Sequence, residues 1–288
     1  MFFTFLVKIT TFVKNRPMVT VSIVCYHTEV DELSRSLDSL QSAAVGRIYV
    51  VDNSSQAYLR DYCRERGVEY ISSANVGYGA GHNQAIRRAL AAGSRYHLVM
   101  NSDVEFTPAV VGRIEAFMEA NTDVGLLQPR VLNVDGSVQT TCRLLPTPFD
   151  LVLRRFLPES LFRGRRRRYT LEEYDHRTPL EVAYLQGSFL FFRLADLEKV
   201  GLFDERFFMY PEDIDISRRM RRISRVLYWP KVEIVHAHRA SSYRSAKMLR
   251  IHVENMIRYF NKWGWLVDAE RRRLNREVLH KALEASGK

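Results

Sequence analysis

Three carboxylates within four residues form the stretch of the chain best suited to chemistry. Glu212, Asp213 and Asp215 directly follow Tyr210-Pro211. Adjacent like charges repel, so a buried cluster of this kind needs cations, protons or hydrogen bonds around it. A carboxylate held in such a place can act as a general base. A helix N-terminus is the plainer interpretation, because Pro211 suits the first turn and acids favour the positive end of the helix dipole.

Further polar groups directly follow runs of β-branched and apolar residues. Such runs at 20–26, 47–51 and 97–100 predict buried parallel strands, and helical patterns at 32–42 and 56–66 separate them. This βαβ order predicts a parallel sheet with helices on both faces, in which ligands bind at the carboxyl ends of the strands. Three such ends carry polar clusters: Tyr26-His27-Thr28, Asp52-Asn53-Ser54-Ser55 and Asn101-Ser102-Asp103.

A glycine-rich run, Asn75-Val76-Gly77-Tyr78-Gly79-Ala80-Gly81, precedes a helix predicted at 84–92. Glycines allow close backbone approach, and a helix N-terminus favours phosphate. The glycines stand at alternate positions and follow a short third strand predicted at 68–71, so they do not match the dinucleotide-binding fingerprint, which follows the first strand. A flexible loop is the alternative interpretation.

In the second half, a buried run at 182–193 is interrupted by Gln186-Gly187-Ser188. A polar break inside a core strand often marks a bulge beside a site. Two short strands are predicted at 225–230 and 232–235, and the second runs into His236 and His238. Alternate residues of a strand share a face, so we expect both histidines to point into one site.

Composition limits the class of protein. The 288 residues carry 43 basic and 33 acidic side chains, a net charge of +10. That excess attracts phosphates, anionic lipid headgroups or nucleic acid. The three cysteines are odd in number and widely spaced, which predicts neither a zinc site nor a disulfide framework and fits a reducing cytoplasm. No segment reaches the roughly 20 apolar residues of a membrane span.

Three segments leave alternatives open. The N-terminal amphipathic segment, 1–18, is either an interfacial helix or a helix packed on its own domain. The stretch 154–168 carries seven arginines and one acid. It is either a solvated loop or a segment that contacts an anion or a membrane. The basic amphipathic tail, 246–288, is predicted to be helical, and packs on the domain or lies on a membrane surface.

Taken in order, these motifs resemble the inverting family 2 glycosyltransferases of the GT-A fold, especially the rhamnosyltransferase-like branch. The resemblance spans about 19–244 and is carried by Val19 to Thr28, Val51 to Ser55, Asn75 to Gly79, Met100 to Asp103, Gln186 to Ser188, Tyr210 to Asp215 and Val235 to His238. It implies an α/β fold with a mixed sheet flanked by helices. The catalytic domain would span 19–245, with a nucleotide-binding half at about 19–130 and an acceptor half at about 131–245.

The resemblance also implies roles for single residues. Asp213 would be the general base, and its neighbour Glu212 would raise its proton affinity. Asp103 would bind Mg²⁺ or Mn²⁺ with help from His236, although Asn101 stands where the family's metal motif has its first acid. The nucleotide-sugar pocket would use Tyr26, Thr28, Asp52, Asn75, Gly77, Asn83, Asn101 and Ser102, and the acceptor site Gln186, Gly187 and Ser188. Arg218 or Arg219 would offset the acidic charge or reach phosphate.

The implied activity is sugar transfer with inversion, with L-rhamnose from dTDP-rhamnose as the expected donor. The acceptor would be a hydroxyl of a saccharide or lipid-linked saccharide. The implied place is the cytoplasm, peripheral to the inner face of the cell membrane, with a homodimer as one possible state and no nucleic-acid partner.

Two other classes of function compete with this one. A nucleotidyltransferase would want a basic glycine-rich loop after the first strand, and 26–33 contains neither Gly nor Lys. A non-enzymatic nucleic-acid or membrane binder would use the positive charge but leave the acidic stretch unexplained.

Overall fold

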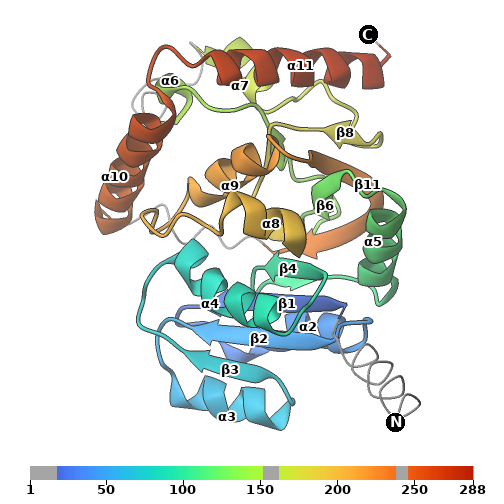
Figure 1. Ribbon diagram of the computed structural model, residues 1–288, viewed down its shortest axis with the longest axis vertical. Coiled ribbons are helices and arrows are strands. Elements are labelled where there is room, and N and C mark those ends of the chain that lie inside the picture. The colour runs from blue at the N-terminus through green and yellow to red at the C-terminus, as the bar shows by residue number, and fades with distance from the viewer. Residues whose placement is uncertain (1–17, 152–161, 238–245, 288) are drawn as a thin grey trace, which may run out of the picture.

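The computed structural model describes residues 18–151, 162–237 and 246–287 (Figure 1). The predicted N-terminal helix, the first part of the arginine-rich stretch and His238 lie outside these ranges. Within them, one sheet of nine strands runs through the molecule in the order β3-β2-β1-β4-β10-β6-β11-β5, with β8 also paired to β11.

The first half forms a parallel sheet, as predicted. Its strands are β1 (Val19–Cys25), β2 (Arg47–Asp52), β3 (Glu69–Ser72) and β4 (Tyr96–Met100). Their connecting helices are α2 (Val30–Gln41), α3 (Ala57–Glu65) and α4 (Tyr78–Ala91).

Helix α4 begins at Tyr78, so the expectation of a glycine-rich loop reaching to residue 84 is wrong. Glycine is needed at three positions of this run because a Cβ atom there would lie too close to a neighbouring residue. A Cβ on Gly79 would lie 2.9 Å from Phe203, and one on Gly81 would lie 2.9 Å from Val24. Gly77 has φ +98°, and a Cβ there would lie 2.3 Å from the carbonyl oxygen of Phe208. The run therefore seats α4 against the sheet and against the segment that leads into α9.

The second half makes the sheet mixed, as the GT-A resemblance implied. β10 (Phe189–Arg193) lies antiparallel between β4 and β6 (Val124–Leu132), whereas β11 (Arg225–His236) runs parallel to β6. Short β5 (Val104–Glu105) and β8 (Leu180–Glu181) pair antiparallel with β11.

Two strand predictions are wrong in detail. β11 is one strand with a register shift between Trp229 and Glu233, where two strands were expected. The run at 182–193 is split instead: β9 (Tyr184–Leu185) leaves the main sheet and pairs with β7 (Cys142–Arg143).

Helices cover both faces of the sheet. Buried residues of α2, α3 and α5 (Ala109–Ala120) form one hydrophobic cluster. The other cluster includes residues of α4, α8 (Leu194–Val200), α9 (Glu212–Met220), α10 (Ala246–Trp263) and α11 (Ala269–Ala285). Short α6 (Pro148–Leu151) and α7 (Arg163–Tyr169) lie near α10 and α11 (Figure 1). Cys25, Cys63 and Cys142 are buried and unbridged.

The tail is two helices broken at Gly264, which has φ +101°. Its apolar side chains Met256, Phe260, Leu274 and Val278 are buried in the second cluster. These side chains pack on the domain, whereas Ile257 of the same apolar stripe is 41% exposed, so a membrane contact of the tail stays a prediction. No helix in the described ranges combines the length and the apolar character that crossing a membrane requires.

A chain of buried hydrogen bonds joins α4 to two strands. Ser22 Oγ lies 2.7 Å from His82 Nδ1 and 2.8 Å from His97 Nε2, and Thr20 Oγ1 lies 2.8 Å from His97 Nδ1. Both histidines are fully buried. Burial lowers the pKa of His97 to about 3 and holds the pKa of His82 well below its usual value.

These histidines should make folding acid-sensitive. Unfolded histidine has a pKa near 6.5, so below that pH the unfolded chain binds protons that the folded chain refuses. The free energy of unfolding should fall by up to about 1.4 kcal/mol per histidine for each pH unit below this value. Urea unfolding between neutral pH and pH ~5 measures this. His97→Asn should flatten the dependence, and the exposed His280→Asn should not; equal slopes in all three proteins would contradict it.

Candidate active site

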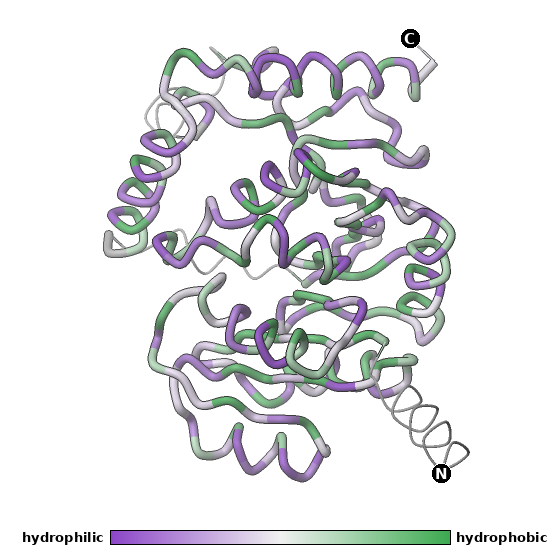
Figure 2. Tube along the Cα trace, in the orientation of Figure 1, coloured by the Kyte–Doolittle hydropathy of each residue, from purple (hydrophilic) through white to green (hydrophobic). Residues whose placement is uncertain are grey.

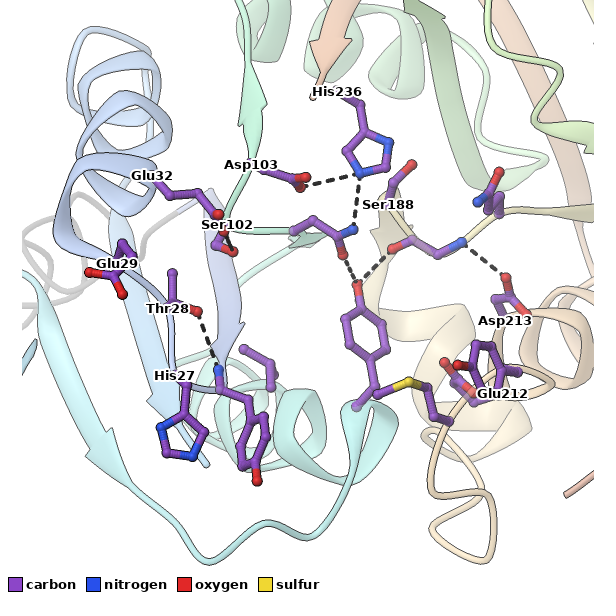
Figure 3. Close-up of a pocket in the computed structure, with 18 residues that line it drawn as sticks. His27, Thr28, Glu29, Glu32, Ser102, Asp103, Ser188, Glu212, Asp213 and His236 are labelled. Atoms are coloured by element: carbon purple, nitrogen blue, oxygen red, sulfur yellow. Dashed lines mark hydrogen bonds and ion pairs between the residues drawn. The ribbon is translucent and has the colours of Figure 1, made fainter. Parts of the chain in front are cut away.

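A cleft of about 570 Å³ opens at the carboxyl ends of β1 and β4 (Figure 3). It is lined by the loop after β1 and the first turn of α2, the start of α4, the loop after β4, the break at 186–188 and the entry to α9. His236, the last residue of β11, adds a side chain from another strand. The cleft is therefore built from segments that are distant in sequence and that the sheet brings to one edge.

Most of the predicted site residues meet in this cleft, and four do not. The lining includes Tyr26, Thr28, Asn101, Ser102, Asp103, Gln186, Gly187, Ser188, Glu212, Asp213 and His236. Asp52, Asn75, Gly77 and Asn83 are not among its lining residues.

Asp52 and Asn83 serve the fold around the cleft. Asp52 accepts hydrogen bonds from Ser54, from the backbone of Gln56 and from the Tyr70 hydroxyl. Although burial raises its pKa, these bonds hold the pKa of Asp52 below its usual value. The Asn83 amide bonds to both backbone groups of Phe203 and so ties α4 to the segment before α9. The structure gives both side chains a place in the fold, and their donor-binding role stays a prediction.

Asp213 stands in the first turn of α9, partly exposed to the cleft. One carboxylate oxygen accepts from the Gly187 backbone N–H at 3.0 Å, and the other from the Ile214 N–H at 2.7 Å. Burial raises the pKa of Asp213 to about 7, against these hydrogen bonds and the charge of Arg143, which lower it. A carboxylate with this pKa is well matched to proton abstraction near neutral pH.

Glu212 differs from Asp213 although the two are adjacent. It is only 4% exposed, and its Oε2 atom has no hydrogen-bond partner. Burial, followed by the negative charge of Asp213, raises the pKa of Glu212 well above its usual value. Repulsion between the two adjacent carboxylates therefore adds to burial, which is the largest cause of the raised pKa of both groups.

Asp215 points away from the cleft into a contact with the tail. It accepts from Trp263 Nε1 at 2.8 Å and pairs with Lys262 and with Arg219. Arg218 is 1% exposed, and its guanidinium donates to both carboxylate oxygens of Asp268. The expectation that Arg218 or Arg219 reaches phosphate or offsets the charge at Asp213 is wrong; both arginines hold α9 in place.

A continuous chain of hydrogen bonds joins Asp213 to Asp103 across the cleft (Figure 3). From Asp213 it passes through Gly187, whose carbonyl oxygen lies 2.7 Å from the Tyr78 hydroxyl. That hydroxyl also lies 2.8 Å from Asn101 Oδ1, and Asn101 Nδ2 lies 3.2 Å from His236 Nε2. Tyr78 has no counterpart in the sequence predictions, because its neighbours come from other segments.

His236 and Asp103 form the other end of this chain. Gln139 donates from Nε2 to the His236 carbonyl oxygen, so its Oε1 faces His236 Nδ1 at 3.1 Å. Nδ1 must therefore carry a proton, and the lone pair of neutral His236 lies on Nε2, which is 3.2 Å from Asp103 Oδ1. Asn101 Nδ2 can donate to this lone pair, and a cation bound between Nε2 and Asp103 Oδ1 would replace that hydrogen bond.

This pair fits one edge of a divalent-metal site. Two neighbouring ligands in an octahedron with bonds of about 2.1 Å lie about 3 Å apart. A carboxylate oxygen with an imidazole nitrogen suits Mn²⁺. Among the described residues no group of three or more His, Cys, Asp or Glu side chains is arranged to hold a metal. Oxygens from a bound substrate or water would have to complete the shell.

The charges of the side chains that line the cleft also favour a bound cation. The ionisable acids of its lining are Glu29, Glu32, Asp103, Glu212 and Asp213, and no Lys or Arg occurs among the described lining residues. Ser102 donates to Glu32 at 2.5 Å, which orients that carboxylate. A diphosphate would be repelled here without a cation. The protein's net positive charge therefore lies elsewhere on the molecule.

Comparison with known proteins decides the family. The pattern "Glycosyl transferase family 2" matches residues 21–201, which include the ends of β1, β2 and β4 and the break at 186–188. The chain belongs to glycosyl transferase family 2. This family 2 glycosyltransferase carries its predicted base, Asp213, and His236 beyond the matched range.

Two relatives are similar over most of the chain. An N-acetylglucosaminyl-diphospho-decaprenol L-rhamnosyltransferase of Mycobacterium tuberculosis is 31% identical over 233 residues, covering 73% of each protein. The low-salt glycan biosynthesis hexosyltransferase Agl10 of Haloferax volcanii is 30% identical over 208 residues. That match covers 71% of this chain and 62% of the length of Agl10.

A solved structure shares the fold. GalNAc-T7, crystallised with UDP, GalNAc and Mn²⁺, superposes with a TM-score of 0.61 at 14% identity, over 95% of this chain and 56% of that one. This likeness confirms the GT-A expectation for the family 2 glycosyltransferase described here.

Proposed function

We propose that the protein is an inverting glycosyltransferase that moves L-rhamnose from dTDP-rhamnose to a hydroxyl of a saccharide or lipid-linked saccharide. The observation that carries the proposal is the single cleft in which Asp213 and the Asp103–His236 pair lie at the two ends of one hydrogen-bonded chain. The relative from Mycobacterium tuberculosis supports the sugar and the lipid-linked acceptor, because its name states both.

In this mechanism, the base acts on the acceptor. Asp213, held by the Gly187 N–H, accepts the proton of the acceptor hydroxyl as that oxygen attacks the anomeric carbon. The bond to the diphosphate breaks on the opposite side, so the configuration inverts, through an oxocarbenium-like state. Glu212 stays protonated and presents a hydrogen-bond donor toward the cleft.

The other end of the cleft receives the leaving group. Asp103 and His236 would hold a divalent cation, with Gln139 fixing the imidazole, and that cation would neutralise the diphosphate as it gains charge. Tyr26, exposed at the mouth of the cleft, supplies a ring against which a nucleobase can stack. The division into donor and acceptor halves near residue 130 remains a prediction, as do the homodimer and a cytoplasmic place at the membrane surface.

The experiment is a screen of nucleotide sugars with Mn²⁺, read by thermal stabilisation and by transfer to a diphospho-polyprenol sugar. We expect dTDP-rhamnose to stabilise most and to be the donor that is consumed. NMR of the product should show an anomeric configuration opposite to that of the donor. Preference for another donor would contradict the rhamnose assignment, and retained configuration would contradict the inverting mechanism.

A further inference from the structure

The turn between α10 and α11 exposes three apolar side chains in succession. Leu266 is 85% exposed, Val267 79% and Trp265 41%. The first two are the most exposed large apolar side chains in the described part of the chain. Figure 2 shows this turn in green at the corner where the two helices meet. Single exposed apolar residues are ordinary, but a cluster held outward marks an interaction site.

The turn is held rigidly in its outward position. Gly264 breaks α10 with φ +101°, a conformation that favours glycine. Trp265 Nε1 donates to Asn261 Oδ1 at 2.8 Å, and its ring lies 5.2 Å from the ring of Phe260. Arg271 donates to the Trp265 carbonyl oxygen at 3.1 Å. Leu266 and Val267 therefore project from an ordered base.

Exposed arginines surround this end of the molecule. Helix α7 carries five arginines and no acid within its seven residues. It connects to the tail through short links: Arg165 pairs with Asp150 of α6, and Arg271 of α11 donates to the Pro146 carbonyl oxygen. On α11, the exposed side chains include Arg272, Arg273 and Arg276.

A groove of about 530 Å³ between α7 and α11 is lined by both apolar side chains and arginines. Its apolar lining includes Leu171, Leu279 and Leu283, and Arg168 and Arg276 stand beside them. Neither arginine forms an ion pair with another described residue. The rim also carries the ion pair of Arg167 with Glu173. Apolar surface beside two unpaired guanidinium groups complements anionic, chain-bearing molecules.

We propose that Trp265–Val267 and the arginines of α7 and α11 form a docking surface for an anionic lipid bilayer. The apolar tip enters the headgroup region, and the arginines pair with lipid phosphates. This surface differs from the expected one, because part of the apolar stripe of the tail helices, including Met256 and Phe260, is buried against the domain. The proposal extends the proposed function, because a lipid-linked acceptor would lie in the same bilayer, but it does not depend on which sugar is transferred.

Vesicle flotation tests the surface without measuring transfer. The full chain should float with phosphatidylcholine vesicles that contain phosphatidylglycerol and not with phosphatidylcholine alone, and added salt should weaken the binding. The double variant Leu266→Ser, Val267→Ser should lose more than about tenfold in affinity, because it removes the inserted apolar groups. Val134→Ser is the matched control: it removes a side chain that is 75% exposed on another loop and should float like the wild type.

A second readout locates the contact. Lipids brominated near the headgroup should quench the fluorescence of Trp265, and Trp265→Phe should remove that quenching while the more buried Trp229 and Trp263 stay unaffected. Wild-type protein that ignores anionic vesicles, or a tip variant that floats as the wild type does, would overturn the proposal. A tip variant with a changed molar mass in light scattering and unchanged flotation would also overturn it, and would assign the turn to contacts between copies of the chain.

Discussion

An Asp213→Asn variant should lose about 10²- to 10⁴-fold in kcat/KM while its affinity for the donor nucleotide stays close to that of the wild type. The amide keeps the shape of the carboxylate and can still accept from the Gly187 N–H, but it cannot take a proton from the acceptor. Steady-state kinetics with a saturating donor, together with calorimetric titration of the nucleotide, separates these two effects. Retained transfer would remove Asp213 as the base.

The pH dependence of kcat/KM is an independent test of Asp213 as the base. The base must be ionised to act, and burial raises the pKa of Asp213 to about 7. In the wild type, kcat/KM should therefore fall about tenfold per pH unit as the pH drops below this value and level off above it. The Asp213→Asn variant should lack this limb in whatever transfer remains.

Glu212→Gln is the matched control for the acidic stretch. Since burial raises the pKa of Glu212 well above its usual value, a glutamine resembles the neutral carboxylic acid, and we expect a loss of less than about tenfold. Were the losses reversed, so that Glu212→Gln abolished transfer and Asp213→Asn spared it, the two carboxyl groups would have to exchange roles.

Removing the divalent cation should have the second-largest effect. The described lining contains no Lys or Arg that could stabilise a departing diphosphate, and a bound cation would take that role. We expect EDTA to abolish transfer, Mn²⁺ to restore it, and Asp103→Ala to lower kcat/KM by about 10²-fold or more. Titration of Mn²⁺ calorimetrically should show weak binding to the protein alone and tighter binding with the nucleoside diphosphate present, because the protein supplies few ligands.

Gln139→Ala provides a graded comparison for the metal. It leaves both ligands in place but frees the His236 ring, and loss of such an outer contact costs about 10- to 100-fold in metal affinity. Full activity of both Asp103→Ala and the EDTA-treated enzyme would contradict the metal assignment.

Much of the site could be predicted from the sequence because its clearest motifs are formed by residues that are close together in the chain. β-Branched runs that end in polar residues predicted the strand ends that bear Tyr26, Asn101 and Asp103. The pattern of acids after Pro211 likewise predicted where α9 begins. The start of α4 was missed because glycine has low helix propensity, and only the packing against Phe203 and Val24 explains its use there.

Residues whose roles depend on distant partners were beyond the reach of local patterns. Nothing in the spacing of Gln139 or Tyr78 tells that one orients His236 and the other bridges Asn101 and Gly187. Local spacing does not tell where each of the three acids after Pro211 points. In the structure, Asp215 is turned toward Trp263, which lies 48 residues further along the chain.

That contact bears on how the enzyme can be divided. Residue 245 looks like the natural limit of the catalytic domain, but Asp215 and Arg218 of α9 find their partners in Trp263 and Asp268. A fragment ending at 245 would leave Arg218 without Asp268 and Asp215 with Arg219 as its remaining ion-pair partner, on the very helix whose first turn presents the base. We therefore expect the smallest working enzyme to extend into the tail, although no residue of the tail lines the cleft that the structure describes.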